Sequence, residues 1–172
     1  MKRSSRFVRE MVMMAAMAAI LFLQKEILAG IPNVQLVSFL ILLYAKCTGL
    51  WRTGIIVTVY VLLDSVFWGS LNPIFTPAQW IGWMLGPLIL CTLLKKVEDS
   101  IPLAFANVFF AFLYCWVMII PTAWLIHVDI RKYILADIPF EIILAVSAFL
   151  PTLLLYEPMI RILRRLWNGN MQ

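Results

Sequence analysis

Six stretches of largely apolar residues, each near the length that a bilayer requires, constrain this chain more than any other feature. A helix that crosses the hydrocarbon core needs about 20 predominantly apolar residues, whereas barrel strands alternate polar and apolar side chains. The stretches do not alternate, and they cover roughly residues 11–28, 34–50, 54–68, 79–94, 103–126 and 139–163. Hydrophobic residues make up 63% of the 172 residues and charged residues 13%, a composition that excludes a soluble domain. The sequence therefore predicts one all-α integral membrane domain over residues 1–172, with six transmembrane helices.

Basic residues are divided unevenly between the two sides of this predicted domain. Of the 14 Lys and Arg residues, Lys25, Arg131 and Lys132 fall on one side and the remaining 11 on the other. Cytoplasmic loops carry an excess of Lys and Arg, so we expect the richer side to be cytoplasmic. Both termini belong to that side, as an even number of spans also requires. The net charge of +5 then reflects cytoplasmic loops beside anionic headgroups rather than nucleic-acid binding.

Polar and aromatic side chains gather towards the predicted outer face, and the rest of each span is mostly aliphatic. Ionisable groups at membrane depth are costly and usually face protein or a hydrated cavity. Depth and chemistry thus give five candidate ligand contacts: Asp64, Trp68, Trp83, His127 and Glu141. For the tryptophans, the alternative is a belt of interfacial anchors. For the two carboxylates it is a helix cap or a salt bridge to Lys25 or Arg131, and for the histidine it is a position in a loop without ligand contact. We expect that loop to be long, over residues 127–138, and we expect Trp51 and Trp167 to anchor the cytoplasmic interface.

Two further features bear on packing. Pro87, Pro121 and Pro151 fall inside predicted spans, where each removes a helix hydrogen bond and permits a kink. In the segment MAAMAAI, Ala15 and Ala19 lie four residues apart on one helical face. Small residues at this spacing let another helix approach closely. That helix belongs either to this chain or to a separate membrane subunit.

Recognisable catalytic and nucleotide-binding motifs are missing from the sequence. It contains no G-x-x-x-x-G-K-[ST] loop, no H-E-x-x-H and no G-x-S-x-G. The three cysteines form no C-x-x-C pair and there is one histidine, so we expect no metal site and no cofactor. We therefore expect no enzymatic activity, and any transport must draw energy from a partner or an ion gradient. A stand-alone carrier or channel that uses Asp64 or Glu141 as a proton or cation site is one alternative, and a membrane-embedded enzyme or assembly factor is another.

The chain resembles the substrate-binding S components of energy-coupling factor (ECF) transporters, the bacterial and archaeal vitamin-uptake systems. The resemblance rests on the size, the six-span pattern with cytoplasmic termini, and the Ala15 and Ala19 spacing. It also rests on two segments, IPNVQLVSFLILLY at residues 31–44 and ADIPFEIILAVSAFLPTLLLYEPMIRIL at residues 136–163. The second departs from family members in being apolar at Leu144 and Ala148.

This resemblance implies a multi-pass protein of the bacterial or archaeal cell membrane that captures a vitamin or related micronutrient near the outer face. It implies docking through Ala15 and Ala19 to a transmembrane coupling subunit, which works with two cytoplasmic ATPase subunits. It adds Glu26, Asn33 and Gln35, in the region of the first loop, to the expected ligand contacts. Because aromatic faces stack on flat rings and carboxylates accept N–H bonds, a flat, nitrogen-bearing ligand is favoured.

Overall fold

The computed structural model describes residues 2–31, 34, 36–69, 71–127 and 129–171. Within these ranges the chain forms six α-helices and no strand, which confirms the all-α prediction. The helices are α1 (Lys2–Leu28), α2 (Val37–Thr48), α3 (Leu50–Phe67), α4 (Phe75–Thr92), α5 (Ser100–Ile126) and α6 (Ile130–Met171). Four described segments are long and apolar enough to cross a membrane: Arg6–Leu28, Leu50–Phe67, Ser100–Leu125 and Ile130–Gly169.

The short helix α2 forms the centre of the fold. It contacts all five other helices, and ten of its 12 residues are buried. At 1.5 Å per residue it extends only about 18 Å, against about 30 Å for the hydrocarbon core. The stretch predicted as a span over residues 34–50 is therefore helical over a shorter range. Its side chains are apolar because protein surrounds them, a situation that composition does not distinguish from lipid.

A single glycine separates α2 from α3. Gly49 has a φ of 83°, in the left-handed region, and its N–H donates to the Ala45 carbonyl at 3.1 Å. Only glycine adopts this conformation without a steric penalty, so α2 ends here and α3 begins at the next residue. The predicted break between the second and third stretches, over residues 51–53, is therefore wrong, since α3 already begins at Leu50.

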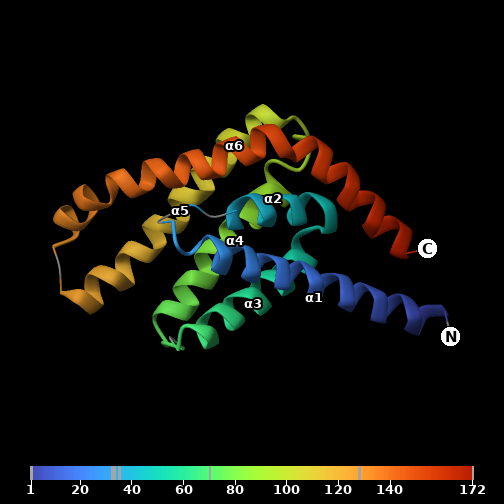
Figure 1. The fold of residues 1–172 in the computed structure, drawn as a ribbon, viewed down its shortest axis with the longest axis horizontal. Coiled ribbons are helices and arrows are strands. Elements are labelled where there is room, and N and C mark those ends of the chain that lie inside the picture. Colours follow the sequence, from blue (N-terminus) through green and yellow to red (C-terminus); the bar gives the residue numbers. More distant parts are fainter. Residues whose placement is uncertain (1, 32–33, 35, 70, 128, 172) are drawn as a thin grey trace.

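The long outer loop predicted over residues 127–138 is also wrong. Helix α6 begins at Ile130 and continues for 42 residues, so Arg131, Lys132 and Asp137 lie in its first turns. The carboxylate of Asp129 accepts a bond from the Arg131 N–H at 2.8 Å, the kind of contact that begins a helix. Three prolines lie within α6, at 139, 151 and 158. Each removes only one backbone hydrogen bond, so the helix bends rather than stops (Figure 1).

The helices alternate in direction along one long axis. Both termini lie at the same end of the molecule, with the α2–α3 and α4–α5 connections, and we call this the terminal end (Figure 1). The C-terminal ends of α1, α3 and α5 lie towards the opposite, distal end.

The terminal end also holds a contact that corrects one expectation. Trp167 is buried, with the Arg52 guanidinium 5.5 Å from its ring centre, whereas Trp51 is 82% exposed. Arg52 is also paired with Glu10. Trp167 therefore joins helices α3 and α6 and is not the interfacial anchor that we predicted, because the arginine of α3 provides a partner for its ring.

Candidate ligand-binding site

The distal end contains a buried carboxylate with two partners from two other helices. Asp64, in the last turn of α3, is almost fully buried. One of its oxygens pairs with the ammonium of Lys25 on α1, and the other accepts a 2.7 Å bond from the Gln79 amide on α4. A buried carboxylate is tolerated only when it is paired and hydrogen-bonded. Asp64 therefore ties α1, α3 and α4 together, and its expected alternative partner Lys25 is confirmed.

A second pair of predicted residues meets beside this cluster. The Trp68 indole N–H donates to the Glu26 carboxylate at 3.1 Å, and Trp68 is largely exposed. Two residues earlier in α1, Gln24 accepts a 2.9 Å bond from the backbone N–H of Leu36, just before α2. These contacts place Glu26 and Trp68 at the rim of the Asp64 cluster, with the beginning of α2 held nearby.

The predicted contact Trp83 belongs to an aromatic pair rather than to an open wall. Its ring stacks on Tyr114 of α5, with 3.9 Å between ring centres and 20° between planes. The stack is possible because Gly82 lacks a side chain: a Cβ there would lie 2.8 Å from the Tyr114 ring. One face of Trp83 is therefore already covered, and a ligand could meet only its edge or its other face.

Two polar groups near this stack are buried without a partner in the described structure. They are the Trp83 indole nitrogen and the Ser38 hydroxyl of α2. Both residues line a small cavity of about 10 Å³ between α2, α4 and α5. Buried polar groups normally have hydrogen-bond partners, and a volume of this order accommodates one water or one small polar group. Ser38 lies within an apolar run, so its position along the chain does not indicate this cavity.

Glu141 and His127 are not part of the Asp64 cluster. Glu141 lies on α6, which packs mainly against α5 and meets α3 at the terminal end, where Arg52 lies over the Trp167 ring. Its carboxylate lies within hydrogen-bonding reach of the Trp116 indole on α5. His127 is exposed at the C-terminal cap of α5, with a φ of 54°. The remaining predicted contacts, Asn33 and Gln35, lie outside the described residues.

The predicted docking residues are open to the surroundings. Ala15 and Ala19 are both exposed on α1, whereas Ala18 packs into the core. The described helices of this chain therefore leave these two alanines uncovered.

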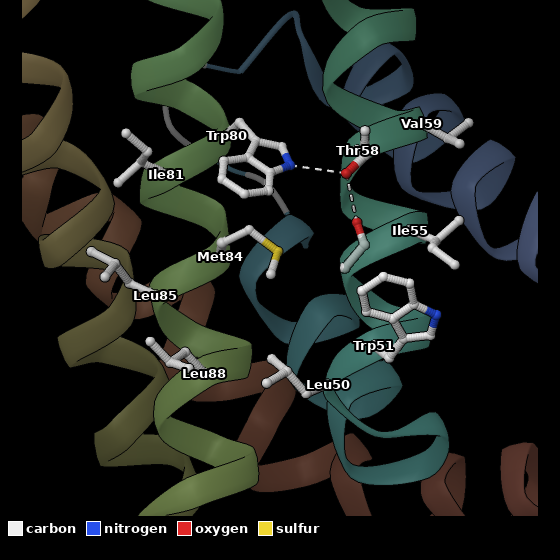
Figure 2. A pocket seen from close by; sticks show the side chains of 11 residues that line it. Leu50, Trp51, Ile55, Thr58, Val59, Trp80, Ile81, Met84, Leu85 and Leu88 are labelled. Atoms are coloured by element: carbon white, nitrogen blue, oxygen red, sulfur yellow. Dashed lines mark hydrogen bonds between the residues drawn. The ribbon is translucent and has the colours of Figure 1, made fainter.

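Figure 2 shows a different feature, an apolar groove of about 590 Å³ between α3 and α4. Its polar contacts lie at the distal part, where the Trp80 indole N–H donates to the Thr58 hydroxyl at 2.9 Å and that hydroxyl donates to the Gly54 carbonyl at 2.8 Å. The rest of the lining is aliphatic, methionine or tryptophan.

Two further observations concern metal binding and similarity to known proteins. Within the described ranges, no three His, Cys, Asp or Glu side chains lie close enough together to hold a metal ion. Comparison of the chain with protein families, curated proteins and solved structures finds no match.

Proposed function

We propose that this chain is the substrate-specific binding subunit of an ATP-driven importer of the ECF type, which captures a vitamin or related micronutrient at its distal end. The observation that carries the proposal is the gathering of the Lys25–Asp64–Gln79 cluster and the Glu26–Trp68 pair at one end of an otherwise apolar bundle. Polar groups at membrane depth are costly, and they commonly mark a ligand path.

The proposed topology has six crossings and both termini in the cytoplasm. The common end of the two termini supports it, as do Lys46, Arg52 and Lys95 near the α2–α3 and α4–α5 connections. An excess of basic residues is typical of the cytoplasmic side. The short helix α2 makes its crossing inside the bundle, so its ends need not reach both lipid interfaces. The distal end is then the outer face.

Exposed alanines on α1 support docking to a coupling subunit. Ala15 and Ala19 provide a smooth face on which the backbone of another helix could lie closely. Replacing both with Trp should abolish co-purification with a coupling subunit while ligand binding persists. Co-purification at the wild-type level would reject this face as the docking surface.

The ligand chemistry follows from the rim of the distal cluster. Trp68 offers an exposed aromatic face, and Glu26 beside it offers a carboxylate that accepts N–H bonds. A flat ring bearing nitrogen would satisfy both groups at once.

Native mass spectrometry of the detergent-purified full chain tests the proposal by identifying the small molecule that co-purifies. Trp68→Ala should weaken binding of that molecule about tenfold, since aromatic contacts contribute up to about 1.5 kcal/mol beyond their buried area. Trp124→Ala, which removes another exposed tryptophan from the distal part of α5, is the matched control and should bind normally. Equal binding by both variants, or a wild-type protein that carries no small molecule and binds no vitamin, would reject the proposed site.

A further inference from the structure

We propose that the groove between α3 and α4 holds one acyl chain of an anionic phospholipid, with the phosphate headgroup at Lys46 and Lys95. This inference concerns a lipid site and does not depend on the identity of the imported solute. It does depend on the chain lying in a membrane.

The shape and chemistry of the groove suit a hydrocarbon chain. Gly54 lines it, with the Met84 methyl 3.4 Å from the place that a Cβ of Gly54 would occupy. Bulky side chains such as Ile55 and Leu88 line the rest (Figure 2). Interfaces between membrane helices favour small residues on both sides, because they let two backbones approach. Among the lining residues that the structure describes, Gly54 alone lacks a side chain, so a slender, flexible chain fits better than a second helix.

A basic cavity lies beside the groove, towards the terminal end. Leu50 lines both spaces, and the second cavity, of about 450 Å³, is also lined by Lys46, Lys95 and Glu98. Trp51 stands exposed beside this junction, as tryptophans do at headgroup level. A single ligand with an apolar tail and a polar head could therefore occupy both spaces.

The charge at this cavity is positive. Glu98 is the acidic residue in the lining, and both of its oxygens are engaged by Arg164, at 2.9 and 3.0 Å. The Lys46 ammonium donates to the backbone carbonyls of Leu94 and Val97, both at 2.6 Å, and to that of Lys95 at 3.5 Å. Its three N–H groups are therefore engaged by carbonyls, and it contributes a fixed positive charge rather than a direct hydrogen bond to the phosphate.

Lys95 is exposed and forms no ion pair with the residues that the structure describes. Together with Lys46 it leaves a fixed and an adaptable positive charge beside the groove, which complements a phosphodiester.

The headgroup, not the tail, should decide which lipid binds. Bulk lipid is as apolar as the groove, so an acyl chain that moves from the bilayer into the groove gains little transfer free energy. Each basic residue near an anionic headgroup is worth about a fivefold change in affinity. Two lysines therefore predict roughly a 25-fold preference for phosphatidylglycerol over phosphatidylcholine with the same chains.

Native mass spectrometry of the full chain in detergent, titrated with these two lipids, measures the preference directly. Lys95→Gln should reduce the phosphatidylglycerol preference about fivefold, and Lys132→Gln, an exposed lysine in the first turn of α6, should leave it unchanged. Gly54→Leu fills the groove and should reduce binding of both lipids by tenfold or more. Ala136→Leu, at an exposed position of α6, is the control for added volume.

Equal affinity for the two lipids would overturn the basic headgroup site. If Gly54→Leu binds both lipids as the wild type does, the groove is not the acyl-chain site. Loss of a bound partner helix in Gly54→Leu, with lipid binding unchanged, would show that the groove holds a helix instead. The Lys95→Gln result stands even if Gly54→Leu folds poorly, because Lys95 is a surface residue. The co-purifying solute of the wild-type chain is measured in the same spectra, so failure of the lipid site and failure of the import proposal are told apart.

Discussion

The Lys25–Asp64 pair should respond asymmetrically to removal of one partner. The Asp64 side chain is 7% exposed and the Lys25 side chain 28% exposed. Breaking a buried ion pair by removing one member costs about 3–5 kcal/mol, because the other charge is left without compensation. Lys25→Met strands the more deeply buried charge, so it should lower the free energy of unfolding by about 3–5 kcal/mol.

Asp64→Leu strands the lysine instead, and its long stem allows the ammonium to reach water. We therefore expect a smaller loss of about 2 kcal/mol, which includes the loss of the acceptor for Gln79. The double variant Lys25→Met/Asp64→Leu removes both charges and should be more stable than Lys25→Met alone. For a chain of this length, 1 kcal/mol shifts the melting temperature by about 2–4 °C.

Thermal unfolding in detergent, followed by tryptophan fluorescence, measures all three variants. Glu157→Gln removes one member of the exposed Arg161–Glu157 pair on α6 and should change stability by less than 1 kcal/mol, as surface pairs do. Strictly additive losses in the double variant, or a larger loss for Asp64→Leu than for Lys25→Met, would refute this reasoning.

Three further substitutions probe the packing around the site, each measured by thermal unfolding in detergent. Gly82→Ala should destabilise the protein by about 1–3 kcal/mol, because the added Cβ would lie 2.8 Å from Tyr114. In the control Gly86→Ala the nearest atom to the added Cβ is at 3.6 Å, so that variant should be at least as stable as the wild type. Similar melting temperatures for the two variants would contradict the steric argument. Asn107→Leu removes the buried amide that donates to two α6 oxygens at 3.0 and 2.8 Å and should cost about 2 kcal/mol, a loss that Asn107→Ser, with one donor, should share only in part. Lys46→Met leaves the carbonyls of the α4–α5 connection that Lys46 holds without their donor and should cost about 1–3 kcal/mol. An unchanged melting temperature would show that water replaces the lysine.

The helical class and most helix positions could be predicted because length and apolar character act locally along the chain. The wrong predictions concern segments whose structure depends on the helices packed around them. Residues 37–48 are as apolar as a span, yet α2 is buried by five helices instead of lipid. Residues 130–138 contain charges that suggested a loop, yet Asp129 caps them into α6. In both cases composition describes the side chains and does not say what surrounds them.

The candidate site could be predicted only in part for the same reason. The depth of Asp64 in an apolar run indicated that it needs a partner, and Lys25 was one of the two basic residues predicted as possible partners, with Arg131. Gln79 was not predicted as the second partner, because it lies 15 residues away on a different helix. The Trp83–Tyr114 stack also depends on Gly82, and a lone glycine in an apolar run carries no signal of a close aromatic contact.

The partners of Asp64 also bear on the alternative of a stand-alone carrier. A proton or cation site needs carboxylate oxygens that a cation can reach. At Asp64 one oxygen is engaged by the Lys25 ammonium and the other by the Gln79 amide. An incoming cation would have to displace a like charge that is fixed to a neighbouring helix, and it would strand that charge in a partly buried place. A neutral or zwitterionic solute could instead bind at the Glu26–Trp68 rim and leave the ion pair intact. At Asp64, this arrangement therefore favours a carboxylate that holds the helices together over one that must be loaded and emptied in each transport cycle.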